Sequence, residues 1–157
     1  MGQLARITGI VALGAAVAFA AVQLVPYGPD RSVSPPSVEP AWDSPRIRDL
    51  AVRACFDCHS GETRWRWYAS VAPASWIVRN DVDRGRADLD LSRWADRPGE
   101  EAAEAGEAVR TGGMPPWYYL LLHPDARLTD EEREALADGL DATVRRRARA
   151  AHAPIGS

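Results

Sequence analysis

The stretch Cys55-Phe56-Asp57-Cys58-His59 holds both cysteines of this 157-residue chain within a few positions. Cys-x-x-Cys-His is the attachment pattern of a c-type haem. Two intervening residues on a helical turn let both thiols reach the vinyl groups on one side of the macrocycle. The histidine that follows can turn its imidazole toward the iron. The sequence therefore predicts one covalent haem on Cys55 and Cys58, with His59 as an iron ligand.

Other chemistries use the same residue types. A thioredoxin-like redox pair needs a βαβ pattern around the two cysteines, and the sequence shows none. Structural zinc takes four ligands, which Cys55, Cys58, His59 and His123 can supply in principle. Adjacent Cys58 and His59 are an awkward pair for one tetrahedral ion, so haem is favoured and zinc stays open.

The second iron ligand has two candidates. Met114 is the one methionine apart from Met1, and it lies in Gly112-Gly113-Met114-Pro115-Pro116. Glycines permit a close approach of the backbone to a macrocycle, and prolines stiffen such a loop. Thioether sulfur ligates iron in cytochromes c. The prediction is ligation by Met114, with His123 as the alternative.

The N-terminus carries an uncharged apolar run from Ile7 to Val25, preceded by Arg6. About 20 such residues span a bilayer as a helix. A signal peptide is the alternative, because Ala18-Phe19-Ala20 has the form of a cleavage site. The run continues past that site, which favours an uncleaved anchor. Both interpretations place the rest of the chain outside the cytoplasm.

The remaining sequence predicts helices joined by loops, hence an all-α fold. The expected helices cover 44–55, 74–85, 98–110 and a segment that starts after Thr129. Ser44-Pro45 is a typical N-cap with proline at the first helical position. Thr129 and Glu132 form a capping box.

The expected organisation is an anchor or signal segment over 1–25, a Pro-rich linker over 26–43, a haem-binding domain over 44–145 and an Arg-rich tail over 146–157.

Composition narrows the possible partners. The formal net charge of −3 is too small to indicate nucleic-acid binding, so none is expected.

The aromatic residues are expected to fill the core of a small domain, to line the haem, or both. Arg64 and Arg66 are candidates for pairing with the haem propionates.

Several motifs together resemble those of the bacterial haem-binding domain family of exported, often membrane-anchored proteins. They are Cys55-Phe56-Asp57-Cys58-His59-Ser60, Trp67-Tyr68, Ala72-Pro73-Ala74-Ser75-Trp76, Ser92-x-Trp94, Gly113-Met114-Pro115-Pro116 and His123-Pro124. The likeness covers about Ser44 to Leu140. It implies a compact, cytochrome c-like helical domain around one haem, but no defined reaction. Arg66 departs from the small residue or proline expected before Trp-Tyr, which affects loop shape and not ligation.

The function expected from these residues is that of a membrane-anchored mono-haem c-type cytochrome that transfers electrons outside the cytoplasm. An iron ligated by both His59 and Met114 has no open position for a substrate, so an enzymatic role is not favoured. Redox proteins and the lipid bilayer are the expected partners. The alternatives are a haem-based sensor of small ligands and, less favoured, a peroxidase-like enzyme with His123 beside an open iron.

Overall fold

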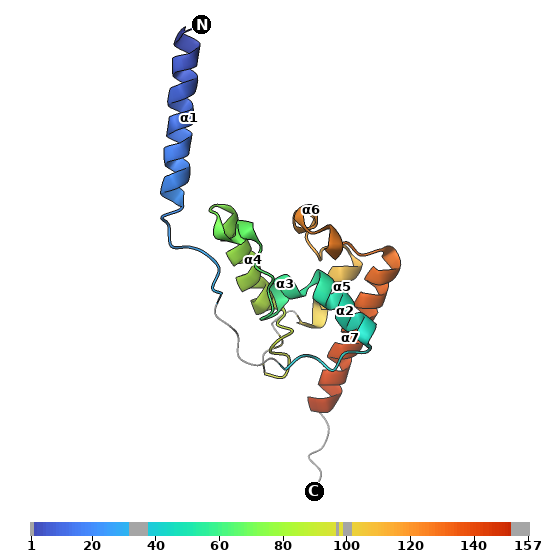
Figure 1. Cartoon of the computed structure of the whole chain (residues 1–157). Helices are drawn as coiled ribbons and strands as arrows, with labels where there is room; N and C mark the ends of the chain where they lie inside the picture. The colour runs from blue at the N-terminus through green and yellow to red at the C-terminus, as the bar shows by residue number, and fades with distance from the viewer. Residues whose placement is uncertain (1, 32–37, 97, 99–101, 152–157) are drawn as a thin grey trace. The chain divides into compact units, whose positions relative to one another are not determined.

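The computed structural model describes residues 2–31, 38–96, 98 and 102–151. Over these residues the chain is helical and has no strand; a single parallel bridge joins Val38 and Arg93 (Figure 1). The α-helices are α1 (Gly2–Val22), α2 (Pro45–Ala54), α3 (Phe56–His59), α4 (Ala74–Asp88), α5 (Ala105–Arg110), α6 (Tyr119–Leu122) and α7 (Asp130–Ala151). Three short 3-10 helices are η1 (Trp67–Ser70), η2 (Ala102–Glu104) and η3 (Pro124–Ala126). The all-α prediction is confirmed for this part of the chain.

Two compact units make up the chain. The first comprises Met1–Ser32 and Trp65–Asp81, and the second comprises Val33–Arg64 and Val82–Ser157. The backbone passes between the units after residues 32, 64 and 81. Helix α4 therefore contributes its first half to one unit and its second half to the other.

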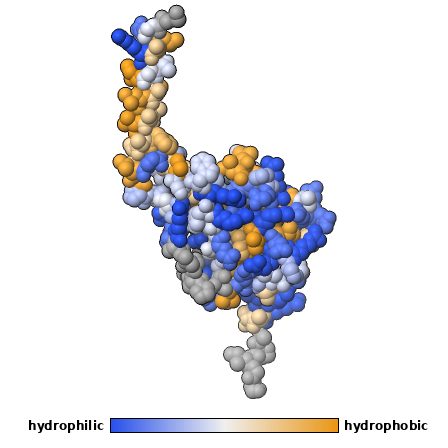
Figure 2. Space-filling view, in the orientation of Figure 1, coloured by the Kyte–Doolittle hydropathy of each residue, from blue (hydrophilic) through white to orange (hydrophobic). Residues whose placement is uncertain are grey.

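Helix α1 is the apolar part of the first unit. It begins at Gly2 and ends at Val22, a little earlier at both ends than the predicted run of 7–25. None of its residues is buried, and its surface is mostly hydrophobic (Figure 2). Its length and composition suffice to cross a bilayer, a property that signal sequences share.

The residues just after α1 pack against the other segment of the first unit. The Gln23 side chain donates to the carbonyl of Ala72 (3.0 Å) and accepts from its amide (2.9 Å). Arg31 donates to the Ser70 hydroxyl at 2.7 Å. The first part of the predicted Pro-rich linker is thus bound to structure within its own unit, because its arginine and the nearby glutamine find polar partners there.

The second unit begins with helices whose caps follow the sequence pattern. Ser44 is the N-cap of α2, and its hydroxyl accepts from the amide of Ile47 at 3.3 Å. At the start of α7 the Glu132 amide donates to the Thr129 hydroxyl at 3.2 Å, and the Thr129 amide donates to the Glu132 carboxylate at 2.9 Å. Both predicted caps are confirmed.

The core of the second unit lies among α2, α5 and α7 (Figure 1). Its most deeply buried large side chains include Leu91, Leu136 and Leu140. Gly139 brings α7 close to α2, because a Cβ at this position would lie 2.6 Å from Cγ2 of Ile47. The glycine therefore lets α7 pack directly on α2, where a larger residue would overpack the contact and lower the stability of the fold.

One predicted helix differs from the structure. The expected helix over 98–110 begins only at Ala105, and the 3-10 turn η2 precedes it. Pro98 is not helical, and residues 97 and 99–101 lie outside the described part. The turn η2 leads directly into α5, and 3-10 turns are frequent at the starts of α-helices. Over 102–110 the structure therefore differs from the prediction only in the geometry of the first turn.

Helix α7 continues past the expected domain end at 145. Arg146 forms an ion pair with Asp43 (2.8 Å), and Arg147 donates to the carbonyls of Trp94 and Ala95. The first arginines of the predicted tail are therefore helical and in contact with the second unit. The boundary at 145 itself stays a prediction.

Candidate functional site

The two cysteines lie one helical turn apart. Cys55 ends α2 and caps α3, and its carbonyl accepts from the amides of Cys58 (3.2 Å) and His59 (2.9 Å). Neither cysteine forms a disulfide bond; Cys55 is buried and Cys58 is partly buried. Both cysteines therefore lie on one turn of backbone that hydrogen bonds hold in place.

His59 is oriented by the second half of α4. Its Nδ1 lies 2.7 Å from the carbonyl of Gly85 and 3.0 Å from that of Leu89. Two carbonyl acceptors place the ring proton on Nδ1, so the Nε2 lone pair is available for a metal. This is how proteins commonly hold a ligating histidine.

Gly85 makes that contact possible. A Cβ at this position would lie 2.8 Å from the carbonyl oxygen of Cys58 and 3.1 Å from its Cβ. Any larger residue would separate the two helices. On the other side of the motif, the Leu91 amide donates to the carbonyl of His59 at 2.8 Å, and Arg86 donates to that of Ser60 at 2.9 Å. The segment that follows the cysteines is therefore fixed by backbone contacts.

The residues present fit a haem better than they fit zinc or thiol redox chemistry. Among the described residues, no group of at least three His, Cys, Asp or Glu side chains is placed to hold a metal ion. Burial, with a smaller effect of Cys58, raises the pKa of the Cys55 thiol to about 12, whereas reactive cysteines have lowered values. With Nδ1 facing two carbonyls, His59 would offer Nε2 to a haem iron, which needs no second protein donor beside it.

Met114 lies in the loop after α5. Its amide donates to the carbonyl of Ala108 at 2.9 Å, and its side chain packs partly buried against the core cluster that contains Cys55 and Phe56. Gly112 has a φ of +77°, a conformation that glycine adopts without strain. The structure thus brings the Met114 loop and the segment Cys55–His59 to the same core.

A polar network that the sequence analysis missed lies beside the motif. Asp57 is only 7% exposed and accepts from the amide and guanidinium of Arg64 (3.0–3.2 Å) and from the Tyr119 hydroxyl (2.8 Å). The ring of His123, 1% exposed, stacks on Tyr119 with centroids 3.9 Å apart. The spacing of four between Tyr119 and His123 was the available signal, since such residues share a helical face.

The contacts of this network shift the pKa values of Asp57 and Tyr119. Burial acts to raise the pKa of Asp57, but the hydrogen bonds from Arg64 and Tyr119 outweigh it and hold that pKa below its ordinary value. Burial, followed by the charge of Asp57, raises the pKa of the Tyr119 phenol. Asp57 is therefore a buried carboxylate compensated by one guanidinium and one hydroxyl, as a buried charge requires.

His123 is held in this network, stacked on a ring and with its Nδ1 3.9 Å from Asp57. Ligation of iron by His123 would require the ring to leave that stack. Arg64, a candidate for pairing with the propionates, instead contacts Asp57 at 3.1 Å and Asp125 at 3.5 Å. The assignment of the second iron ligand to Met114 stays a prediction.

The aromatic residues divide between core and surface. Trp94 is 6% exposed and belongs to the core of the second unit. Trp117 is 74% exposed, and Leu121 and Leu122 on α6 are also largely exposed. Because Tyr119 bonds α6 to Asp57 in the motif, this apolar surface lies beside the motif helix. It is the kind of surface that a large apolar cofactor covers.

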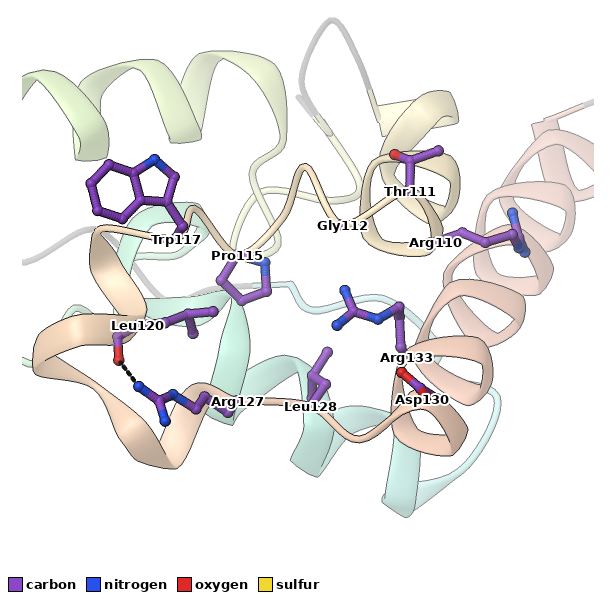
Figure 3. A pocket seen from close by; sticks show the side chains of 10 residues that line it. All are labelled: Arg110, Thr111, Gly112, Pro115, Trp117, Leu120, Arg127, Leu128, Asp130 and Arg133. Atoms are coloured by element: carbon purple, nitrogen blue, oxygen red, sulfur yellow. Dashed lines mark hydrogen bonds between the residues drawn. The ribbon is translucent and has the colours of Figure 1, made fainter.

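A separate pocket is lined by Gly112 and Pro115 of the loop after α5. It has a volume of about 600 Å³, and Pro115 and Trp117 contribute to one wall while Arg127 and Arg133 contribute to another (Figure 3). At one edge of the pocket Arg127 donates to the carbonyl of Leu120 at 3.4 Å (Figure 3). Cys55, Cys58 and His59 do not line this pocket.

A helical unit with an oriented histidine directly after two cysteines has the features of a small helical haem protein. The family model described as haem-binding domain matches residues 17–142, most of the chain, so the chain belongs to this family. Haem binding follows from that membership, and the resemblance seen in the sequence is confirmed. No curated protein and no solved structure shows a significant match.

Proposed function

We propose that the protein is a membrane-anchored mono-haem c-type cytochrome that transfers electrons outside the cytoplasm. The observation that carries the proposal is the orientation of His59 by the carbonyls of Gly85 and Leu89, directly after the two cysteines. In this proposal each thiol of Cys55 and Cys58 adds across one vinyl group, so that two thioether bonds form and the sulfur-bound protons move to carbon.

In this proposal His59 and Met114 are the axial ligands. A haem with both axial positions filled supplies rapid one-electron exchange with little rearrangement. The residues around it hold the ligands in place. The α4 carbonyls fix the His59 ring, and the glycines and prolines of the Met114 loop restrict its backbone. Such a site favours an electron carrier over a sensor or a peroxidase, which need an open position.

The first experiment tests the covalent bond and the ligands. The full chain is produced with c-type maturation machinery, denatured and stained for haem, and its oxidised and reduced spectra are recorded. We expect covalent haem, low-spin spectra and a weak sulfur-to-iron band at the red end of the ferric spectrum. Met114→Ala should abolish that band, whereas His123→Asn should keep it.

Each alternative has its own outcome in this experiment. A high-spin ferric spectrum with rapid binding of carbon monoxide indicates an open iron and supports the sensor. Turnover with hydrogen peroxide in addition supports the peroxidase. Absence of covalent haem refutes the proposal and returns Cys55 and Cys58 to zinc or thiol chemistry.

Anchoring by α1 is tested separately. We expect the mature chain to retain Met1 or Gly2, to resist alkaline extraction from membranes, and to be accessible to protease from the extracytoplasmic side. An N-terminus that begins just after Ala20 would show signal cleavage instead and would refute the anchor. The location outside the cytoplasm would survive that result, since both interpretations share it.

A further inference from the structure

The hydroxyl of Tyr119 connects the Met114 segment to the haem-attachment helix. Tyr119 begins α6, a few residues after Met114, and Asp57 lies in α3 between the two cysteines. The hydroxyl donates to Asp57 Oδ2 at 2.8 Å, and the two residues are 62 positions apart in the chain. A hydrogen bond to a carboxylate that is only 7% exposed is strong, because its acceptor is charged and shielded from water.

We propose that Tyr119 is a positioning residue, whose bond to Asp57 holds the Met114 loop against the motif and so maintains the Met114–iron bond. The inference rests on the proposed function, because it takes Met114 as the axial ligand. It identifies the contact that controls whether that ligand stays bound.

Both partners of the bond are held in place. On the Asp57 side, Arg64 donates through its amide, Nε and Nη2 at 3.0–3.2 Å, which fixes the carboxylate. On the Tyr119 side, the ring of His123 stacks at 3.9 Å with an angle of 8° between the planes. Because neither partner is free to rotate away, little conformational entropy opposes the bond.

The chain between Met114 and Tyr119 is stiff enough to transmit this constraint. Pro115 and Pro116 follow Met114 directly, and both have a restricted φ. The amides of Tyr119 (3.1 Å) and Leu120 (3.3 Å) both donate to the carbonyl of Pro116. On the other side of the loop, the Met114 amide donates to Ala108 at 2.9 Å. Met114 is thus held between an attachment to α5 and one to the motif helix.

A role confined to folding makes a different prediction from a role in holding the ligand. Loss of a bond that only stabilises the fold lowers the denaturation midpoint and leaves the folded haem site unchanged. Loss of a bond that holds Met114 raises the population of molecules in which the sulfur has left the iron, while the protein stays folded. The population of that open form is therefore the quantity to measure.

The test uses the full chain with covalent haem and the variant Tyr119→Phe, which removes one oxygen and keeps the ring. We expect carbon monoxide to bind the reduced variant about tenfold faster than wild type, equivalent to about 1.4 kcal/mol. We also expect the sulfur-to-iron band to disappear about one pH unit lower on alkaline titration. Tyr118→Phe, the matched control, removes the same atom from the neighbouring residue and should leave both values unchanged.

A double-mutant cycle tests whether Tyr119 acts through Asp57. In an Asp57→Asn background, which keeps an acceptor oxygen but removes its charge, Tyr119→Phe should have a clearly smaller effect. If Tyr119→Phe alone yields too little holoprotein, Asp57→Asn alone should shift both readouts in the same direction, by less. Wild-type rates in Tyr119→Phe, or an equal effect in both backgrounds, would overturn the inference.

The variants Met114→Ala and Tyr119→Phe together distinguish a failure of this inference from a failure of the proposed function. If Met114→Ala abolishes the red band but Tyr119→Phe changes neither readout, the ligand assignment holds and only the positioning role is wrong. If Met114→Ala keeps the band, the assignment of Met114 fails, and the positioning role fails with it.

Discussion

Replacing Gly85 with alanine tests the packing of α4 on α3, which holds Cys58 and His59. The added methyl group would lie 2.8 Å from the carbonyl oxygen of Cys58, 3.1 Å from its Cβ and 3.2 Å from its carbonyl carbon. All three atoms are backbone atoms or directly attached to it, so no flexible side chain can turn away. The helices must separate, which also weakens the contact between Gly85 and His59 Nδ1.

The expected loss follows from three contributions. Overpacking of a well-fitted contact costs about 1–3 kcal/mol. Weakening the hydrogen bond from His59 adds about 1 kcal/mol. Alanine is a better helix former than glycine by about 1 kcal/mol, which acts in the opposite direction. We therefore expect Gly85→Ala to lower the free energy of unfolding by about 1–3 kcal/mol.

Chemical denaturation of the full chain in detergent, followed by helical circular dichroism, measures this change. Ala87→Gly is the matched control, because Ala87 is exposed on the same helix and reports propensity alone, a loss of about 1 kcal/mol. If Gly85→Ala instead stabilises the protein by a similar amount, propensity alone operates at both positions, and the close contact between α4 and Cys58 is refuted.

Further substitutions test the caps, the core and the acid sensitivity of the second unit. Ser44→Ala removes the acceptor for the Ile47 amide and should cost about 1 kcal/mol, seen as a lower denaturant midpoint; an unchanged midpoint would contradict the cap. Gly139→Ala places a methyl group 2.6 Å from Cγ2 and 2.8 Å from Cγ1 of Ile47 and should cost about 1–3 kcal/mol, seen as a lower denaturant midpoint; an unchanged midpoint would contradict the close contact. The hydrogen bond from Arg48 holds the pKa of Glu39 below its ordinary value, against the effect of burial. The pair therefore stabilises the fold fully above the ordinary pKa of about 4.3, and this contribution disappears as the pH falls through the lower folded value. Glu39→Gln should reduce the acid-induced fall of the denaturation midpoint between about pH 5 and pH 3, and an identical slope in both proteins would contradict the ion pair.

Local sequence signals predicted where two of the helices begin. Ser44-Pro45 and the pair Thr129/Glu132 predicted where α2 and α7 begin, because caps satisfy backbone groups next to them in sequence. The start of the α-helix before Arg110 was missed, because the turn that precedes it, Ala102–Glu104, is a 3-10 helix. Propensity does not separate the first turn of an α-helix from a 3-10 turn.

In the candidate site, the sequence points to Cys55, Cys58 and His59, because their spacing matches the haem pattern, and their role stays a prediction. The partners of His59 could not be predicted, because they are the backbone carbonyls of Gly85 in α4 and of Leu89 just after it, and not side chains. Arg64, one of two candidates for a propionate, contacts Asp57, and no pattern in the sequence links Asp57 to Tyr119.

The two hydrogen bonds between Gln23 and Ala72 have a consequence for the segment Trp65–Asp81. A segment joined to an anchor by one flexible linker samples a volume set by the length of that linker. Here Gln23, directly after α1, binds Ala72 through both its amide nitrogen and its amide oxygen, and both residues belong to the first unit. With α1 in a bilayer, as proposed, this segment would stay beside the end of the helix, at the depth of the lipid headgroups.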